Sequence, residues 1–232
     1  MESPIYIRIH NHIKEEIEDG KWQVGDRIPA ERDLAEEFGV SRMTLRQAVQ
    51  TLVDEGILER RVGAGTFVAR KKVQEKMSGI TSFTELMENQ GKHPSSRTIS
   101  YQITSPSLSE REHLKLKKQQ KVLRMERIRY ADDVPICFEV ATLPFDLVKD
   151  YERSQITKSL YQTLAKNGLH IGHAQQTVSA SSASEKIAEF LNIKRGAPIL
   201  NLRQITKLST GEPFEYVRTE YAGERFEFYL EK

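Results

Sequence analysis

Apolar residues in the first quarter of the chain recur at helical spacing in three segments. The first segment repeats isoleucine at every fourth position, at Ile5, Ile9, Ile13 and Ile17. The other two carry shorter stripes, which consist of Leu34, Ala35 and Phe38 and of Leu45, Ala48, Val49, Leu52 and Val53. Because one face of a helix recurs every three or four residues, these stripes predict three amphipathic helices. Each stripe is too short to bury much surface alone, so we expect the helices to pack on one another.

A tight turn and a glycine-centred hairpin surround the third predicted helix. Gly39 stands where a helix commonly ends in a left-handed cap, and the Ser41 side chain can accept a hydrogen bond from the first N–H groups of the next helix. Predicted strands at 58–62 and 66–69 flank Gly63-Ala64-Gly65, where glycine allows a tight turn. This order of parts predicts a winged helix-turn-helix, a DNA-binding motif.

Polar and basic residues occupy the outer face of the third predicted helix and the wing. Arginine can pair with guanine O6 and N7 in the major groove, and a helix start offers N–H groups to phosphate. The alternative is an ordinary three-helix domain with a solvated charged face, but the cap, apolar stripe, basic face and wing occur in the order expected for DNA binding. The candidate DNA contacts are Ser41, Arg42, Thr44, Arg46 and Gln47 on the helix and Arg61, Gly63 and Gly65 in the wing.

The distribution of charge supports this interpretation better than the net charge of +2 does. Residues 2–40 hold five Lys and Arg against ten Asp and Glu, whereas residues 41–72 hold seven against three. Basic charge is thus concentrated on the predicted DNA-reading helix and wing. The single cysteine, Cys137, excludes an intramolecular disulfide, and no apolar run reaches membrane-spanning length, so we expect a cytoplasmic protein.

Beyond a charged segment at 70–78, the pattern changes to strands mixed with helices. We predict strands at 98–103, 122–131, 135–143, 171–179, 199–208, 215–221 and 226–230. Predicted helices lie at 83–89, 110–116, 159–167 and 185–191. Short turns join most neighbouring strands, so we expect a mostly antiparallel sheet in an α+β domain. The predicted organisation is a winged helix-turn-helix domain at 1–69, a linker at 70–78 and a second domain at 79–232.

The predicted strand 122–131 continues an apolar face into two arginines. Alternation places Arg127 and Arg129 on the face that carries Leu123 and Met125. Glu139 would lie opposite Arg127 if the loop at 131–135 has five residues. Arginine cannot lose its charge, so an inward pair needs a bound anion or buried carboxylates. The residues alone favour the second possibility, a structural Arg127–Glu139 ion pair, because ion pairs between neighbouring strands are common.

Other polar residues could complete an anion-binding pocket. A predicted helix start offers N–H groups and hydroxyls to a phosphate at Ser82, Phe83 and Thr84, although an ordinary N-cap would look the same. Hydroxyl donors could come from Ser159 and Tyr161, and the hydroxyls or amine of a sugar could be bound by Glu139, Glu215 and Tyr221. The spacing of His170 and His173 would place them on opposite faces of a strand, so we expect no metal site and no cofactor.

The first third of the chain resembles the DNA-binding domain of GntR-family bacterial transcription regulators. The resemblance rests on P-I-Y at 4–6, G-D-R-I-P at 25–29, A-E-R-D-L-A at 30–35, S-R-M-T-L-R-Q-A at 41–48 and G-A-G-T-F-V at 63–68. It implies DNA contacts from Arg32, Ser41, Arg42, Thr44, Arg46 and the wing around Gly65.

The remainder resembles the effector domain of the HutC-like branch of that family, the UTRA domain, which is similar in fold to chorismate lyase. The matching segments are T-S-F-T-E at 81–85, R-I-R at 127–129, D-V-P-I at 133–136, S-L-Y at 159–161 and F-E-Y-V-R-T-E-Y at 214–221. Within the branch, the sequence is most similar to repressors of amino-sugar use, which sense a sugar phosphate. The resemblance implies an effector such as glucosamine 6-phosphate or N-acetylglucosamine 6-phosphate, and it favours the anion site over the structural ion pair.

Three functions are compatible with these patterns. The one that we favour is a ligand-responsive repressor that binds a palindromic operator as a homodimer, because a single winged helix contacts too few base pairs. An enzyme related to chorismate lyase is the second, but no Ser-His-Asp, Cys-His or paired-carboxylate arrangement is identifiable, so we expect no enzyme. A DNA-binding protein without an effector is the third, and the nearly neutral net charge disfavours nonspecific coating of DNA.

Overall fold

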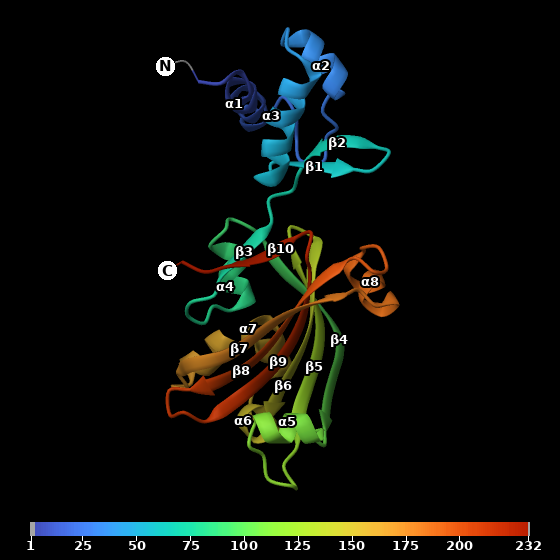
Figure 1. Cartoon of the computed structure of the whole chain (residues 1–232). Helices are drawn as coiled ribbons and strands as arrows, with labels where there is room; N and C mark the ends of the chain where they lie inside the picture. Colours follow the sequence, from blue (N-terminus) through green and yellow to red (C-terminus); the bar gives the residue numbers. More distant parts are fainter. Residues whose placement is uncertain (1–2, 232) are drawn as a thin grey trace. The chain divides into compact units, whose positions relative to one another are not determined.

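The computed structural model describes residues 3–231 and divides the chain into two compact units, Met1–Lys71 and Lys72–Lys232 (Figure 1). Each unit has hydrophobic core clusters of its own. Within residues 3–231, no helix combines the length and the apolar character that crossing a membrane requires.

Unit 1 is the predicted winged helix-turn-helix. Its elements are α1 (Ile5–Glu18), α2 (Glu31–Glu37), α3 (Arg42–Asp54), β1 (Leu58–Arg61) and β2 (Gly65–Val68). The three apolar stripes meet in one core, whose buried members include Ile9, Ile13, Leu34, Leu45, Ala48, Val49 and Leu52. The short helices are therefore stabilised by packing on one another, as their apolar periodicity predicted.

The wing is held by a segment that precedes α2. The backbone N–H of Ile28 donates to the Thr66 carbonyl at 3.0 Å, and Arg27 pairs with Phe67 in an isolated antiparallel bridge. A Cβ atom at Gly65 would lie 2.7 Å from Arg27 Nε, and Gly65 has a φ of +119°. The backbone conformation thus requires glycine at this position, and the missing Cβ also leaves room for the Arg27 side chain.

Unit 2 is built on a six-stranded sheet in the order β4-β5-β6-β9-β8-β7. The strands are β4 (Pro94–Thr104), β5 (Val122–Ala131), β6 (Val134–Pro144), β7 (Ile171–Ser182), β8 (Pro198–Leu208) and β9 (Pro213–Ala222). Every neighbouring pair in this sheet is antiparallel, which confirms the predicted α+β class. Figure 1 shows these long strands side by side, with α5 and α6 at one end and α4 at the other.

The helices of unit 2 are α4 (Phe83–Glu88), α5 (Leu108–His113), α6 (Phe145–Val148), α7 (Arg153–Lys166) and α8 (Glu185–Leu191). Helix α7 begins six residues before the predicted start at 159. Its first turn is capped by Glu152 and Gln155, and the sequence did not indicate this start because Glu is not a usual N-cap residue. Ser159 interrupts α7 with a φ of −157° and a ψ of 92°. The unusual cap and the break at Ser159 together explain the late predicted start, although Ile156 before the break already belongs to the buried face of α7.

The segment 70–78, which the sequence analysis predicted as a linker, contains a strand. Residues 73–76 form β3 (Val73–Lys76), which pairs in parallel with β10 (Phe226–Tyr229). Only residues 69–72 lack regular structure at this connection. The partner strand lies at the opposite end of the sequence, so the local composition of 70–78 could not reveal the pairing.

The hairpin between β5 and β6 sets the register of the arginines. Asp132 and Asp133 both have positive φ, 50° and 63°, and form a two-residue turn rather than the predicted five-residue loop. A bulge at Ile136 then shifts the register by one residue, because Tyr130 pairs with Pro135 whereas Arg129 pairs with Cys137. Arg127 consequently lies opposite Glu139. The predicted pairing is confirmed, although the turn and bulge that produce it differ from the predicted loop.

A buried carboxylate anchors α5 to the sheet. Glu110 is only 2% exposed and accepts hydrogen bonds from Arg124 Nε at 2.9 Å and Arg124 Nη2 at 2.6 Å. Thr142 Oγ1 at 3.0 Å and the Ser107 backbone N–H at 2.7 Å also donate to it. Burial alone would raise the pKa of Glu110, but these hydrogen bonds lower it to about 2.

We predict that Glu110→Gln lowers the free energy of unfolding by about 3 kcal/mol, because it leaves the Arg124 guanidinium without its anion. The folded-state pKa lies below the ordinary value of 4.5, so this contribution is present above pH 4.5 and is lost as the pH falls toward 2. Urea denaturation of both proteins from pH 7 to pH 3 measures this, with exposed Glu112→Gln as the control. Equal pH dependence in wild type and Glu110→Gln would contradict the assignment.

Candidate DNA-contact surface and ligand pocket

The N-terminus of α3 is fixed by the Ser41 side chain. Its Oγ accepts a hydrogen bond from the Thr44 backbone N–H at 3.2 Å and lies 2.9 Å from Thr44 Oγ1. Arg42, Arg46 and Gln47 follow on the exposed face of the helix. Within residues 3–231, the guanidinium groups of Arg42 and Arg46 take part in no ion pair, unlike those of the neighbouring wing. They are therefore free to bind an external partner.

A hollow on the surface of unit 1 brings α3 and the wing together. Four of the predicted DNA-contact residues line it, together with two arginines that the candidate list did not include: Arg46, Arg61, Gly63 and Gly65, with Arg27 and Arg60. Arg27 was missed because nothing in the local sequence indicates its bridge to β2. An adjoining hollow contains Arg46 with Thr44 and Gln47.

In contrast to Arg42 and Arg46, three other arginines of unit 1 already have acidic partners within the chain. Arg60 donates to Gln50 and to Glu31, each at 2.9 Å, and Arg61 donates to Glu59 while its guanidinium lies 4.2 Å from the centre of the Phe67 ring. Arg32 lies on α2, where it pairs with Asp33 at 3.0 Å. Neither hollow includes Arg32, Ser41 or Arg42.

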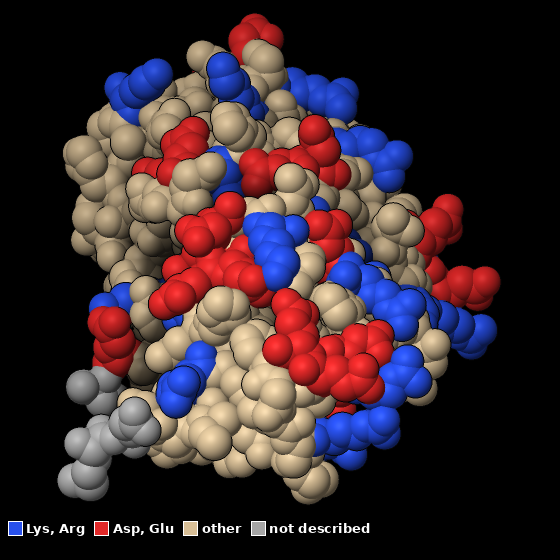
Figure 2. Space-filling model, turned by 90° about the horizontal axis from the view of Figure 1, so that it is seen from above, with Lys and Arg blue, Asp and Glu red and all other residues tan. Residues whose placement is uncertain are grey.

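The protein surface is not uniformly basic. On the face that Figure 2 shows, acidic side chains form clusters, and Lys and Arg side chains lie among and beside them. Together with the net charge of +2, this mixture gives no general attraction to polyanions. The unpaired positive charges of Arg42 and Arg46 on α3 are therefore confined to one part of the surface.

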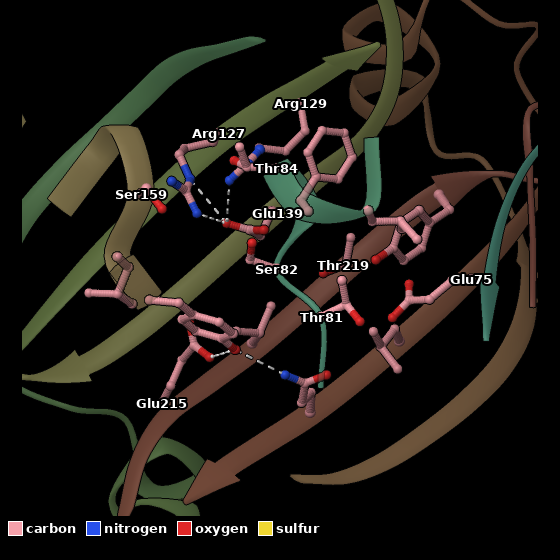
Figure 3. A pocket seen from close by; sticks show the side chains of 18 of the residues that line it. Glu75, Thr81, Ser82, Thr84, Arg127, Arg129, Glu139, Ser159, Glu215 and Thr219 are labelled. Atoms are coloured by element: carbon pink, nitrogen blue, oxygen red, sulfur yellow. Dashed lines mark hydrogen bonds and ion pairs between the residues drawn. The ribbon is translucent and has the colours of Figure 1, made fainter. Parts of the chain in front are cut away.

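A pocket in unit 2 lies between the large sheet and the helices α4 and α7 (Figure 3). All ten predicted effector-binding residues line it: Ser82, Phe83, Thr84, Arg127, Arg129, Glu139, Ser159, Tyr161, Glu215 and Tyr221. Polar lining residues that the candidate list did not include are Glu75, Thr81, Lys158, Gln204 and Thr219. Sequence periodicity could have indicated Thr219, which alternates with Tyr221 on β9, but not Glu75, whose strand was not predicted.

Two buried arginines share one carboxylate at one side of the pocket. Arg127 is 5% exposed and Arg129 is 6% exposed. Arg127 Nε donates to Glu139 Oε1 at 3.0 Å, and Arg129 Nη1 lies 3.9 Å from the same oxygen. Burial would raise the pKa of Glu139, but the two arginine charges lower it below its ordinary value, so the carboxyl is ionised. One negative charge thus faces two positive charges.

Arg129 is the less satisfied of the two. Its Nη2 donates to Thr84 Oγ1 at a long 3.4 Å, and its guanidinium lies 4.5 Å from the centre of the Phe83 ring. Its Nε is buried and has no hydrogen-bond partner among the described residues. Burial and the neighbouring charge of Arg127 lower the pKa of Arg129 to about 10, so it stays protonated at neutral pH. A buried donor of this kind calls for a partner that the described chain does not supply.

On the opposite side of the pocket lies a second carboxyl group, that of Glu215, whose protonation differs from that of Glu139. Tyr161 OH donates to Glu215 Oε2 at 2.6 Å, and Thr206 Oγ1 donates to the same oxygen at 2.9 Å. Burial raises the pKa of Glu215 to about 7, despite these hydrogen bonds. Glu215 therefore does not fully balance the arginine charges at neutral pH.

Of the predicted hydroxyl residues, Ser82 caps a helix and Ser159 lies at a break within one. The Ser82 hydroxyl caps α4, since it accepts from the Glu85 backbone N–H at 3.2 Å and donates to Glu85 Oε2 at 2.8 Å. Ser159 lies at the break in α7, where the carbonyl of Thr157 accepts from Arg127 Nη1 at 3.0 Å. The break thus frees a backbone carbonyl for the arginine and brings Ser159 to the pocket.

Comparisons with known proteins agree with this two-part architecture. A model of the gntR family of bacterial regulatory proteins matches residues 5–68, and a UTRA domain model matches residues 89–227. The HTH-type transcriptional repressor NagR of Bacillus subtilis is 37% identical over 226 residues, which are 97% of this chain and 93% of NagR.

Two solved structures are also similar. A GntR-family transcriptional regulator from Enterococcus faecalis V583 is 61% identical, with a TM-score of 0.57, over 60% of this chain and 100% of that chain. PhnF from Mycobacterium smegmatis is 27% identical, with a TM-score of 0.73, over 96% of this chain and 98% of PhnF.

These relatives are transcription regulators, and neither domain model describes an enzyme. These findings favour the predicted transcription regulator over the chorismate lyase-like alternative, and the UTRA match supports a small-molecule effector for unit 2. The chain belongs to the GntR family of bacterial transcription regulators, with a UTRA effector domain after its winged helix-turn-helix.

Proposed function

We propose that this protein is a cytoplasmic repressor that leaves its operator when a small phosphorylated sugar binds in the pocket of unit 2. The observation that carries this proposal is that Arg127 and Arg129 share the single carboxylate of Glu139, while the buried Nε of Arg129 has no partner among the described residues. A buried charge without compensation is costly, so the site is suited to an anion that supplies the missing acceptors and charge.

A phosphate fits this requirement better than a neutral sugar does. Its oxygens accept charge-assisted, bidentate hydrogen bonds from arginine. The hydroxyls of Thr84 and Ser159 line the same pocket. The capping box occupies the Ser82 and Glu85 N–H groups, which leaves those of Phe83 and Thr84 without a partner within the helix. Glu215, Tyr161 and Tyr221 are left for the hydroxyls or amine of the sugar. The similarity to repressors of amino-sugar use supports glucosamine 6-phosphate or N-acetylglucosamine 6-phosphate.

We predict that Arg129→Ala keeps operator binding but weakens effector binding by at least about tenfold, because a charged hydrogen bond contributes about 1.5–3 kcal/mol. The measurement is calorimetric titration of glucosamine 6-phosphate and N-acetylglucosamine 6-phosphate, each against its unphosphorylated form. Exposed Arg218→Ala, on the adjoining part of the same sheet, is the matched control. Equal affinity for the unphosphorylated sugars would remove the phosphate from the proposal.

On unit 1, we propose that α3 enters the major groove while the wing lies along the sugar-phosphate backbone. Arg42 and Arg46 are assigned to base edges, with Ser41, Thr44 and Gln47 beside them. Arg32, Arg61, Gly63 and Gly65 are assigned to the backbone. The exposed and unpaired guanidiniums of α3 support this division, because base-reading arginines need both freedom and reach.

Replacing Arg42 or Arg46 by Ala should weaken operator binding by about 1–3 kcal/mol and leave the fold intact. By contrast, Lys71→Ala should weaken binding to all duplexes alike and reduce the dependence on salt. Fluorescence anisotropy with an operator and a scrambled duplex, at several salt concentrations, separates the two effects. Normal operator binding by both arginine variants would show that the reading helix is misassigned.

The proposed assembly is a homodimer formed through unit 2, with one reading helix for each half-site of a pseudo-palindrome. We expect light scattering of the full-length protein to give twice the 26.7 kDa chain mass. We also expect a single half-site to bind far more weakly than the palindrome. A monomer that binds both equally well would contradict this assembly.

A further inference from the structure

Strand β3 links the pocket to the chain segment that leads to unit 1. Residues 69–72 have no regular structure, and Val73 then begins β3. Two residues later, Glu75 lines the pocket together with the arginines and Glu215. Glu75 therefore lies seven residues after Val68, the last residue of the wing strand β2, and three residues after the end of the connection. Strand β3 is thus continuous in sequence with the connection to unit 1.

Glu75 offers an unused carboxyl to the pocket. Figure 3 shows its side chain pointing from β3 into the pocket. Among the described residues, the arginines form their ion pairs with Glu139 and not with Glu75. Burial raises the pKa of Glu75 to about 7, and no hydrogen bond from a described residue offsets this effect. The carboxyl can therefore exchange hydrogen bonds with a hydroxyl or amino group of a bound molecule.

The strand that carries Glu75 is also fastened to α4. The Gln74 backbone N–H donates to Gln90 Oε1 at 3.2 Å, and Gln90 Nε2 donates back to the Gln74 carbonyl at 2.8 Å. Gln90 directly follows the C-cap of α4, whereas Thr84 in the first turn of α4 accepts from Arg129. Strand β3 and helix α4 thus form one connected element with two contacts to the pocket.

Resting on the proposed function, we infer that Glu75 binds a hydroxyl or amino group of the sugar phosphate and couples effector binding to operator release. The phosphate is bound by the arginines and by the start of α4, and the sugar by Glu75 on β3. One ligand thereby bridges both ends of the element formed by β3 and α4. The Glu75 contact forms in the position of β3 that does not support operator binding, and it is absent in the operator complex. Only such a difference in affinity between two states can drive release.

The test measures glucosamine 6-phosphate binding to the free protein and to its operator complex. In Glu75→Ala, binding to the free protein should weaken about five- to tenfold, the contribution of one ordinary hydrogen bond. Binding to the operator complex should be unchanged, so the ratio of the two affinities should fall by the same factor. Glu75→Gln, which keeps a hydrogen-bonding amide, should recover part of this ratio.

Glu227→Ala is the matched control. Glu227 lies on the paired strand β10, opposite Gln74 rather than Glu75, and is not among the residues that line the pocket. It should leave both affinities unchanged, and operator binding without effector should be the same in all variants.

Different results would separate this inference from the proposed function. If Glu75→Ala weakens both affinities equally, or neither, Glu75 is not a coupling residue and the inference is overturned, while a wild-type response to the sugar phosphate still stands. If wild-type protein binds neither sugar phosphate and keeps its operator, the proposed function and the inference both fail.

Discussion

An excess of buried positive charge is the constraint on which unit 2 depends. Arg127 and Arg129 are fixed on the same face of a central strand, and Glu139 supplies one carboxylate between them. Removing ions from water costs several kcal/mol each unless other groups replace the water. The helices that cover the pocket replace this water only in part, because they supply two hydrogen-bond acceptors, the Thr157 carbonyl and the Thr84 hydroxyl. The same few atoms therefore affect the stability of unit 2 and, in the function proposed above, bind the effector.

Periodicity and short motifs were sufficient to predict the winged helix-turn-helix and the antiparallel sheet. Both are dominated by local patterns, namely helical apolar stripes and strand alternation, and all ten predicted pocket residues line one pocket. What could not be predicted depends on contacts between distant segments. Strand β3 forms only by pairing with β10, and Arg27 is positioned by its bridge to Phe67 on β2. Glu75 was missed for the same reason.

The hairpin of Asp132 and Asp133 shows how a correct pairing can follow from incorrect local geometry. Counting residues in a loop predicted that Glu139 faces Arg127. The chain reaches that pairing with a shorter turn, and an extra residue at Ile136 restores the register. A shift by one residue would reverse the faces of a strand. The burial of Cys137 and the inward direction of Glu139 therefore require the bulge, which no composition-based rule could locate.

The pairing of β3 with β10 also has a consequence for how the protein is made. Residues 226–229 are synthesised long after residues 73–76, yet they complete the strand pair directly after the DNA-binding unit. Unit 1 can fold early during synthesis, because all its core residues lie before residue 70. The strand that carries Glu75, by contrast, cannot pair until β10 has been synthesised. A nascent or truncated chain would thus possess a folded DNA-binding unit before it possesses a completed pocket.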